Sequence, residues 1–323
     1  MTGMPNSSRP LVFDEAQVRA AVTIETAIAS ARRAFELTLA DGLAAPMPWH
    51  LEMPDGAVHV KGAAVLGEAT FAVKMSSGFP GNAGRGLPTS SGFSVVFDAA
   101  TGAVQAVLLD NGYLTELRTG AAGGLAADLL APADVETAAV IGTGGQARHQ
   151  LEGLFAVRQP QVLRVCGRRA EGVAELAAWV RGRWDVDVQE ITDADDAVRG
   201  AGVVVTVTSS TAPLFATESL AADVQVTAVE SDTPGKRELP VDLLPSAALV
   251  AVDSLEQSQH LGELQGIDLD DITLLLTMGQ LVAKPRSRPS GRTIADLSGL
   301  GVQDTTVAAA ALEALKVTYP VRT

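Results

Sequence analysis

The stretch Val140-Ile141-Gly142-Thr143-Gly144-Gly145-Gln146-Ala147 decides the fold of the second half of this chain. It ends an apolar run that starts at residue 135, carries the pattern G-x-G-x-x-A, and opens an amphipathic helical pattern that continues to residue 157. Glycines permit a tight turn, while free backbone N–H groups and the positive dipole end of the following helix attract a pyrophosphate. The order strand, turn, helix is the setting in which this motif binds a dinucleotide. It argues against the alternative of a glycine-rich turn that binds nothing.

Strand and helix signals alternate after residue 135, which predicts parallel βαβ units with right-handed crossovers. Helical patterns such as residues 171–184 separate the early strands. The sequence therefore predicts an α/β Rossmann domain, placed at 132–301 after the boundary signal Ala131-Pro132-Ala133. Its strands are expected at six apolar runs: 135–141, 162–166, 186–191, 203–207, 224–229 and 249–253.

The first part of the chain predicts a different, α+β domain. Asp14 fits a helix cap before helical patterns at 18–22 and 24–39, and Thr115 fits the cap of a helix over 116–130. The segment 78–92 is too rich in Gly, Pro and Ser for a regular element, and a helical pattern at 302–317 is expected to pack back on this domain. We therefore place the domain at 1–131 with 302–323. Its strands are expected at 58–60, 70–75, 93–97 and 104–109, the last two joined as a hairpin by the turn residues 98–102.

Composition limits the partners. The chain has 323 residues and a formal net charge of -14, so nucleic acid and anionic membrane surfaces, which are polyanions, are not expected to bind it. No apolar run reaches the length of a membrane-spanning helix, and the start Met1–Pro10 has no hydrophobic leader pattern. We expect a cytoplasmic protein.

The residues that hold metals or form disulfides are too few and too scattered for either purpose. Cys166 is the single cysteine and lies in an expected strand, which favours a core position. The four histidines, His50, His59, His149 and His260, have no metal-ligand spacing. No metal site is expected.

The end of the second Rossmann strand indicates which dinucleotide binds. An acidic residue there bonds the ribose 2′-hydroxyl of NAD, whereas arginine accommodates the 2′-phosphate of NADP. The sequence reads Cys166-Gly167-Arg168-Arg169, with no acid at the tip. NADP(H) is therefore favoured and NAD(H) stays possible, with Arg168 the preferred phosphate contact because its guanidinium is a bidentate fork. The alternative is that both arginines are solvated surface charges.

Several segments together identify a family. They are 71–80 (F-A-V-K-M-S-S-G-F-P), 109–119 (L-D-N-G-Y-L-T-E-L-R-T), 231–239 (S-D-T-P-G-K-R-E-L) and 297–304 (L-S-G-L-G-V-Q-D), besides the dinucleotide turn. In these segments, over nearly its whole length, the chain resembles the ornithine cyclodeaminase and mu-crystallin family. The branch it resembles most contains ectoine-utilisation cyclodeaminase-like proteins. The resemblance implies a homodimer with the cofactor in an interdomain cleft.

The resemblance also implies roles for particular residues. Lys74 and Arg118 would hold the carboxylate of an amino or imino acid, against the alternatives of an edge-strand charge and a surface arginine. Asp232 would be the catalytic acid/base, a role that needs a pKa raised by burial or by a neighbouring carboxylate such as Glu230, which could equally be a solvated acid. The cofactor would be held by Thr119, Gly142, Thr143, Gly144, Gly145, Gln146, Ala147, Arg168, Arg169, Thr208, Ser209 and Ser298.

Two positions depart from the ornithine-specific pattern. His50 stands where relatives carry an arginine that contacts the carboxylate, so this contact would be weaker and pH-sensitive. Lys61 stands near the place of an acid that meets the distal ammonium of ornithine. If Lys61 points into the pocket, like charges repel and a substrate with an anionic or neutral side group fits better. Strand alternation puts Lys61 and His59 on one face, which could equally be the solvent face.

The function expected from the sequence is NAD(P)H-dependent reduction of the C=N bond of an α-imino acid, or the reverse reaction of an amino acid dehydrogenase. One alternative is a redox-neutral cyclodeaminase acting on ornithine or lysine and releasing ammonia. The other is a non-catalytic NADP-dependent ligand-binding protein, against which Lys74, Arg118 and Asp232 argue.

Overall fold

The computed structural model describes residues 9–320, apart from the side chain of Ala83, so most of the start Met1–Pro10 lies outside the described residues. The chain folds into two compact units. Unit 1 comprises the chain up to Arg118 and the segment from Leu300 onward, and unit 2 is Thr119–Gly299. The division falls inside helix α3 (Tyr113–Leu130) and not at Ala131, because the second half of this helix packs into the core of unit 2 through Ala127.

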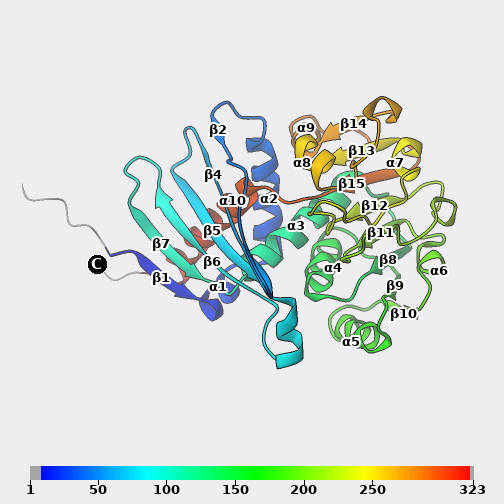
Figure 1. The fold of residues 1–323 in the computed structure, drawn as a ribbon, viewed down its shortest axis with the longest axis horizontal. Coiled ribbons are helices and arrows are strands. Elements are labelled where there is room, and N and C mark those ends of the chain that lie inside the picture. The colour runs from blue at the N-terminus through cyan, green and yellow to red at the C-terminus, as the bar shows by residue number, and fades with distance from the viewer. Residues whose placement is uncertain (1–8, 321–323) are drawn as a thin grey trace, which may run out of the picture. The chain divides into compact units, whose positions relative to one another are not determined.

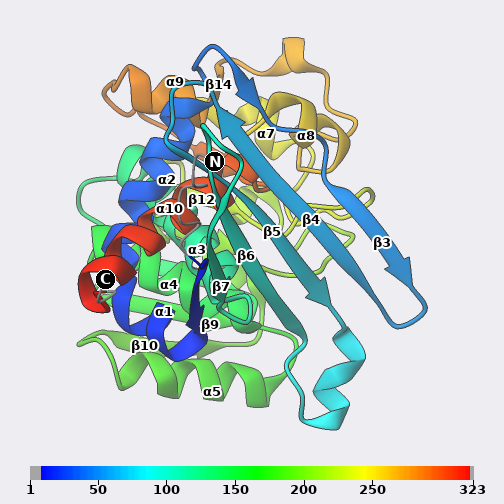
Figure 2. The same cartoon turned by 90° about the vertical axis from the view of Figure 1, so that its left-hand side faces the viewer.

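Unit 1 is built on a seven-stranded sheet of order β1-β7-β6-β5-β4-β2, with β3 paired to β4. All its pairs are antiparallel except β1 with β7. Helix α10 packs against β4, β5 and β6, and Figures 1 and 2 show it with α2 on one face of this sheet. The strands are β1 (Leu11–Asp14), β2 (Leu43–Ala44), β3 (Trp49–Met53), β4 (Gly56–Val65), β5 (Thr70–Gly78), β6 (Ser90–Asp98) and β7 (Val104–Leu109).

Most expected elements of unit 1 are present, and their ends have local causes. Asp14 caps α1 (Glu15–Ala21) through a capping box with Gln17, and α2 (Ile24–Leu37) follows. The β6–β7 hairpin turns at Asp98, whose Oδ1 accepts from the backbone N–H of Ala100 at 3.1 Å and of Thr101 at 2.8 Å. The expected C-terminal helix is α10 (Gly301–Thr318).

Two expectations for unit 1 were wrong. The segment 78–92 is not irregular throughout, since it holds the end of β5, the 3₁₀ helix η1 (Pro80–Arg85) and the start of β6. Thr115 does not cap α3, which begins at Tyr113. The carboxylate of Asp110 accepts the Leu114 N–H at 2.7 Å in its place, after a turn in which Asn111 and Gly112 adopt positive φ. The asparagine and glycine at this turn favour it, because both tolerate left-handed backbone.

Unit 2 is a parallel eight-stranded sheet of order β10-β9-β8-β11-β12-β15-β13-β14. The first five strands follow the doubly wound Rossmann order, in which β8 and β11 flank the switch point. All six expected strands are present: β8 (Thr137–Ile141), β9 (Val162–Cys166), β10 (Asp187–Ile191), β11 (Val203–Thr206), β12 (Gln225–Ala228) and β13 (Leu249–Val252). The sequence did not predict β14 (Leu275–Thr277) or β15 (Thr293–Asp296), whose three and four residues leave little periodicity.

The helices of unit 2 pack with the sheet into two apolar cores, one of which contains residues of α4 and α5. Helix α5 stops at Arg181 and not at residue 184, because Gly182 forms its C-cap. No helix within residues 9–320 is long and apolar enough to cross a membrane. The helical segments are α4 (Gly145–Val157), α5 (Ala170–Arg181), α6 (Ala194–Val198), α7 (Leu243–Ser246), α8 (Leu255–His260), α9 (Met278–Ala283) and the 3₁₀ helices η2 (Thr217–Ser219) and η3 (Leu269–Asp271).

Candidate functional site

Two cations of unit 1 meet on one buried carboxylate. Lys74 projects from β5 toward α10, and its Nζ lies 3.0 Å from Oδ1 of Asp304. Arg118, on α3, donates from Nε to the same oxygen at 3.1 Å and from Nη1 to Gln303 Oε1 at 3.3 Å. All three charged side chains are buried. Oδ2 of Asp304 has no protein partner, so both cations share a single oxygen.

This cluster perturbs the protonation of its members. Burial lowers the pKa of Lys74 to about 8, with Asp304 opposing the change and Arg118 and Lys61 adding to it. Burial alone would raise the pKa of the Asp304 carboxyl, but the charges of Lys74, Arg118 and Lys61 hold it below its ordinary value. A buried site with excess positive charge is a suitable place for an anionic group of a ligand.

Sequence reasoning found Lys74 and Arg118 but gave no role to Asp304. Its position inside the 297–304 motif was visible, but more than 180 residues separate it from both cations. Thr305, the next residue of α10, bonds to Ala63 and Ala72 of β4 and β5. These bonds fix the start of α10 against the sheet and thereby place Asp304 over Lys74.

Lys61 lies on the same face of the sheet as Lys74. The β4–β5 register pairs Lys61 directly with Lys74, and the charge of Lys61 affects the pKa values of both Lys74 and Asp304. The sequence left open whether Lys61 lies on the pocket face or on the solvent face of its strand. The structure places it on the face that carries Lys74. We call Lys61, Lys74 and Arg118 the cationic face of unit 1.

His50 lies on this face one strand further out. It is opposite His59 in the β3–β4 register, and the two Nδ1 atoms are 2.7 Å apart with the rings edge to face. His59 in turn pairs with Ser76 of β5. The cationic face and the histidine pair thus form one continuous polar surface across three strands.

The dinucleotide turn has the geometry that its sequence predicts. Gly142 adopts φ +120°, and a Cβ there would fall against the backbone of Val207, so only glycine fits. Gly144, the N-cap of α4, has no side-chain cap bond, which leaves the first N–H groups of this helix for a ligand. A Cβ at Gly144 or Gly145 would meet nothing within 4 Å. A cavity of about 170 Å³ opens here, lined by Thr143, Gly144, Gly145, Arg148, Gly172, Glu175 and Leu176.

The remaining expected cofactor residues differ in exposure, from exposed arginines to buried serine and alanine. Arg168 and Arg169 are exposed after β9, and Cys166 is buried as expected. The carbonyl of Thr119 accepts from Gln150 of α4 at 3.0 Å. Ser209 is exposed, whereas Ser298 is buried and its hydroxyl lies 2.8 Å from Asp253 Oδ1. Gln146 is half-buried and Ala147 is buried.

Asp232 has a cation, Lys236, as a direct partner. Lys236 Nζ lies 2.8 Å from Asp232 Oδ1, and the two side chains are 25% and 45% exposed. Burial lowers the pKa of Lys236, but the carboxylates of Asp232, Glu230 and Glu238 outweigh it and raise that pKa above its ordinary value. Lys236 lies in the 231–239 segment that carries the family resemblance, but its contact with Asp232 was not predicted from the sequence.

Glu238, which the sequence reasoning also missed, joins the ends of β11 and β12. Its buried carboxylate accepts from the N–H of Thr208 at 2.6 Å, from the hydroxyls of Thr208 and Thr206 at 2.8 and 3.0 Å, and from the N–H of Glu230 at 3.3 Å. Burial raises the pKa of Glu238 to about 7, against the effect of these hydrogen bonds. Hydrogen bonds to the Glu238 carboxylate thereby fix the position of Thr208 and of Glu230, which lies two residues before Asp232.

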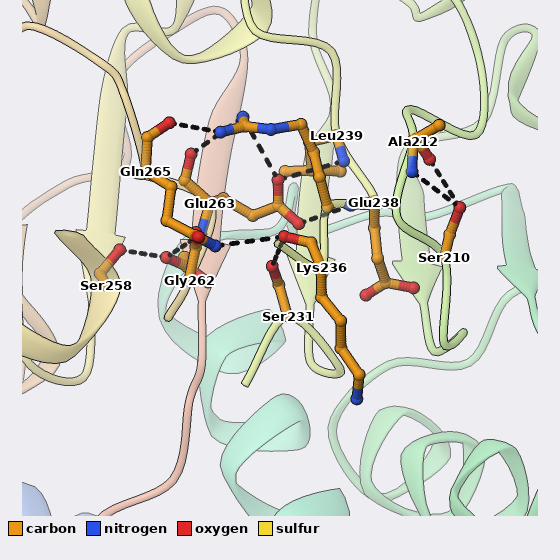
Figure 3. A network of polar contacts seen from close by, with 12 residues as sticks. Ser210, Ala212, Ser231, Lys236, Glu238, Leu239, Ser258, Gly262, Glu263 and Gln265 are labelled. Carbon is orange, nitrogen blue, oxygen red and sulfur yellow. Dashed lines mark hydrogen bonds and ion pairs between the residues drawn. The ribbon is translucent and has the colours of Figure 1, made fainter. Parts of the chain in front are cut away.

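The 231–239 segment is anchored from its other side by 261–265, as Figure 3 shows. Glu263 accepts from the N–H of Glu238 at 2.8 Å and of Leu239 at 3.2 Å, while Arg237 donates to the carbonyls of Glu263 and Gln265. Gln265 bonds Lys236 O at 3.2 Å and Gly235 N at 3.0 Å. The side chains of Lys236 and Glu238 extend away from this anchor. The segment is therefore preorganised at the carboxyl edge of the sheet, where open α/β folds bind ligands.

Within each unit the structure brings expected residues together. In unit 1, Lys61, Lys74 and His50 lie on one face of the sheet, and Arg118 meets Lys74 through Asp304. In unit 2, the turn at Gly142, Thr208, Asp232 and Ser298 follow the carboxyl ends of β8, β11, β12 and β15. Among the side chains of the described residues, no group of three or more His, Cys, Asp or Glu is arranged to hold a metal ion.

A parallel Rossmann sheet with an open glycine turn, joined to a mixed-sheet unit that carries buried cations, defines an NAD(P)-binding oxidoreductase. Residues 10–318 match the Ornithine cyclodeaminase/mu-crystallin family, and the chain belongs to this family. A Rhizobium meliloti protein provisionally named a dehydrogenase is 39% identical over 93% of this chain and 94% of its own length.

Two solved structures have the same fold. An archaeal alanine dehydrogenase dimer with bound NAD superposes with a TM-score of 0.87 at 29% identity, covering 97% of this chain and 98% of its own. The iminosuccinate reductase of Paracoccus denitrificans in complex with NAD⁺ gives a TM-score of 0.85 at 26% identity, covering 96% and 97%.

Proposed function

We propose that this protein reduces the C=N bond of an α-imino acid with NAD(P)H, or oxidises the corresponding α-amino acid in reverse. The observation that carries the proposal is the convergence of Lys74 and Arg118 on a single buried oxygen of Asp304. Two buried cations that share one carboxylate oxygen retain the capacity to bind a second carboxylate, which every α-imino acid has.

The substrate carboxylate would be held mainly by Arg118, whose planar guanidinium bonds carboxylates in bidentate fashion. Asp304 would keep both cations in place when the substrate leaves, since it contacts each of them directly. Lys74, with a pKa of about 8, keeps its proton at neutral pH and can donate a hydrogen bond to the substrate. Such an arrangement orients the α-carbon for hydride transfer.

The glycine turn, the uncapped start of α4 and Thr208 fit a nicotinamide dinucleotide, which when bound supplies or accepts the hydride. We assign Gly142, Thr143, Gly144, Gly145, Gln146 and Ala147 to its pyrophosphate side, with Thr119, Ser209 and Ser298 as further contacts. The exposed guanidinium groups of Arg168 and Arg169 favour NADP(H) over NAD(H), because they are available to a 2′-phosphate.

Asp232 would move the proton that balances hydride transfer at the substrate nitrogen. Its contact with Lys236 provides it with a charge partner in the absence of substrate, and its side chain is exposed enough to meet a ligand. During reduction the hydride adds to the imine carbon and one proton adds to nitrogen, so the products are the α-amino acid and NAD(P)⁺.

We also propose that the protein is a homodimer formed through the outer face of the unit 1 sheet, opposite the cationic face. Register aligns apolar side chains there, with Trp49 beside the half-buried Val60 and the exposed Met75, and Val73 in line with Val12. A contiguous apolar surface of this kind is typical of a protein interface. Its members Val12, Trp49, Leu51, Val73, Met75 and Leu109 are between 36% and 60% exposed in the single chain.

One assay separates the proposal from its two alternatives. Purified protein is incubated with imino acids, formed from keto acids and ammonium, or with ornithine or lysine, while NADPH and ammonia are followed. NADPH consumption with imino acids supports the reductase, whereas ammonia release from a diamine without net NADPH change supports the cyclodeaminase. Nucleotide binding without turnover of any compound, and identical behaviour of Asp232→Asn, would indicate the non-catalytic binding protein. Membership of the ectoine-utilisation branch stays a proposal that rests on the motif resemblance.

A further inference from the structure

The polar surface of unit 1 extends beyond the residues that an α-carboxylate needs. Lys74 and Arg118 account for one carboxylate, yet Lys61 stands beside Lys74 on the neighbouring strand. Two residues before Lys61 on the same face is His59, which contacts His50 of β3. Lys61 and the two histidines therefore form a second polar group next to the first.

The charge of Lys61 decides what this second group can accept. It is close enough to lower the pKa of Lys74 and to help hold down that of Asp304. An ammonium on a substrate side chain would meet a third cation here, and partial burial would strengthen the repulsion. A neutral side chain would gain no charge attraction from Lys61. A carboxylate would be attracted to it and could bond it directly.

The histidine pair supplies N–H donors without requiring a fixed charge. In the Nδ1 to Nδ1 contact of 2.7 Å, one ring must donate and the other must accept. The accepting ring has no proton on Nδ1, so when neutral it carries its proton on Nε2. The contact therefore fixes one Nε2–H donor, and protonation of the donating ring would add a second. The His50–His59 pair thereby offers N–H donors suited to an anion.

We propose that the substrate is an α-imino dicarboxylate, whose side-chain carboxylate is bound by Lys61 with the His50–His59 pair. This inference rests on the proposed function, which it narrows to one substrate class. The reaction is α-imino diacid plus NAD(P)H plus a proton, giving the α-amino diacid and NAD(P)⁺. Hydride forms the new C–H bond and the proton completes the amine, and no other reactant is required.

The kinetic test compares keto acids of two kinds, each with ammonium: oxaloacetate or 2-oxoglutarate against pyruvate. We expect kcat/KM to be at least about tenfold higher for the dicarboxylic imine than for the imine of pyruvate. A hydrogen bond to a charged group stabilises a complex by enough free energy to give a factor of about ten or more. Lys61→Met should lower kcat/KM for the dicarboxylic substrate by about ten- to a hundredfold and change that for pyruvate by less than about threefold. Lys316→Met, at the exposed end of α10, is the matched control and should change neither.

Ligand binding tests the inference without turnover. In the presence of NADP⁺, succinate should raise the melting temperature of the wild type more than propionate does, and Lys61→Met should abolish that difference. Equal effects of succinate and propionate, or equal losses for both substrate kinds in Lys61→Met, would overturn the dicarboxylate inference and leave the proposed reductase intact. If neither imine oxidises NADPH while succinate still binds better through Lys61, the proposed reaction is wrong and the dicarboxylate site stands.

Discussion

Asp304→Asn is the substitution that tests the cation cluster most sharply. It preserves the shape of the side chain but removes the only negative charge that contacts Lys74 and Arg118 among the described residues. Removing one member of a buried ion pair costs about 3 to 5 kcal/mol, because the remaining charge is buried without compensation. Because Asp304 compensates the charges of two buried cations, we expect Asp304→Asn to lower the free energy of unfolding by an amount near the upper end of that range at neutral pH.

The loss of stability in Asp304→Asn should decrease as pH rises, because Lys74 then loses its charge. In the wild type the pKa of Lys74 falls from 10.5 to about 8 in the folded protein, which corresponds to roughly 3 kcal/mol of cost for the buried charge below that pH. The folded state binds fewer protons than the unfolded state, so the contribution of Lys74 to stability rises with pH between about 8 and 10.5. Asp304 raises the pKa of Lys74, so this pKa should be lower in Asp304→Asn. The increase of stability with pH should therefore begin at a lower pH in the variant than in the wild type.

Urea denaturation of both proteins from about pH 6 to about pH 10 measures this difference. The destabilisation caused by Asp304→Asn should be largest near neutral pH and should shrink as Lys74 loses its proton. Glu313→Gln is the matched control, because Glu313 pairs with Lys316 on the exposed side of the same helix and its loss should cost less than about 1 kcal/mol. An Asp304→Asn protein as stable as the wild type, or a loss of stability that does not change with pH, would show that Asp304 does not compensate the buried charges of Lys74 and Arg118.

Three further predictions follow from the geometry of unit 2. Gly142→Ala should lower the melting temperature and weaken NADPH binding by at least about tenfold in a fluorescence titration, because its Cβ meets the Val207 backbone at positive φ. Gly144→Ala should leave the melting temperature unchanged, because its Cβ meets nothing, so equal melting temperatures for the two variants would contradict this. Lys236→Met should lower kcat/KM by about tenfold or more, because it removes the cation that contacts Asp232, while Lys236→Arg should retain most of the wild-type kcat/KM; an unchanged kcat/KM in Lys236→Met would remove Lys236 from the proton chemistry. Arg168→Ala should raise the KM for NADPH selectively, and an equal effect on NADH would sink the 2′-phosphate assignment.

The parts of the fold that depend on local pattern could be predicted from the sequence. The turn at Gly142 and the six expected Rossmann strands carry their signal within a few residues. The wrong cap at Thr115 shows the limit of this signal, since the capping side chain was Asp110 and the intervening turn allowed the helix to start earlier. Strand β15 has four residues and lies between β12 and β13, an insertion that no local pattern reveals.

The candidate site could be predicted in its residues but not in its contacts. Strand alternation put Lys61 and His59 on one face, yet only the β4–β5 register placed Lys74 on the same face. Asp304 reaches Lys74 across 230 positions of sequence. Lys236 and Asp232 are only four residues apart, but the backbone of their segment is held by Gln265 and Glu263 from a distant part of the chain. Long-range packing places Asp304 and this segment, and the periodicity of a single element does not predict it.

Tracing the hydride tests the proposed reduction of the C=N bond. NADPH carrying deuterium at the transferred position of the nicotinamide C4 is incubated with an imino acid, and the amino acid product is analysed by mass spectrometry and NMR. We expect one deuterium at the α-carbon of the product for each NADPH consumed. A product without deuterium at the α-carbon, or product formation without loss of NADPH, would contradict net hydride transfer to the C=N bond.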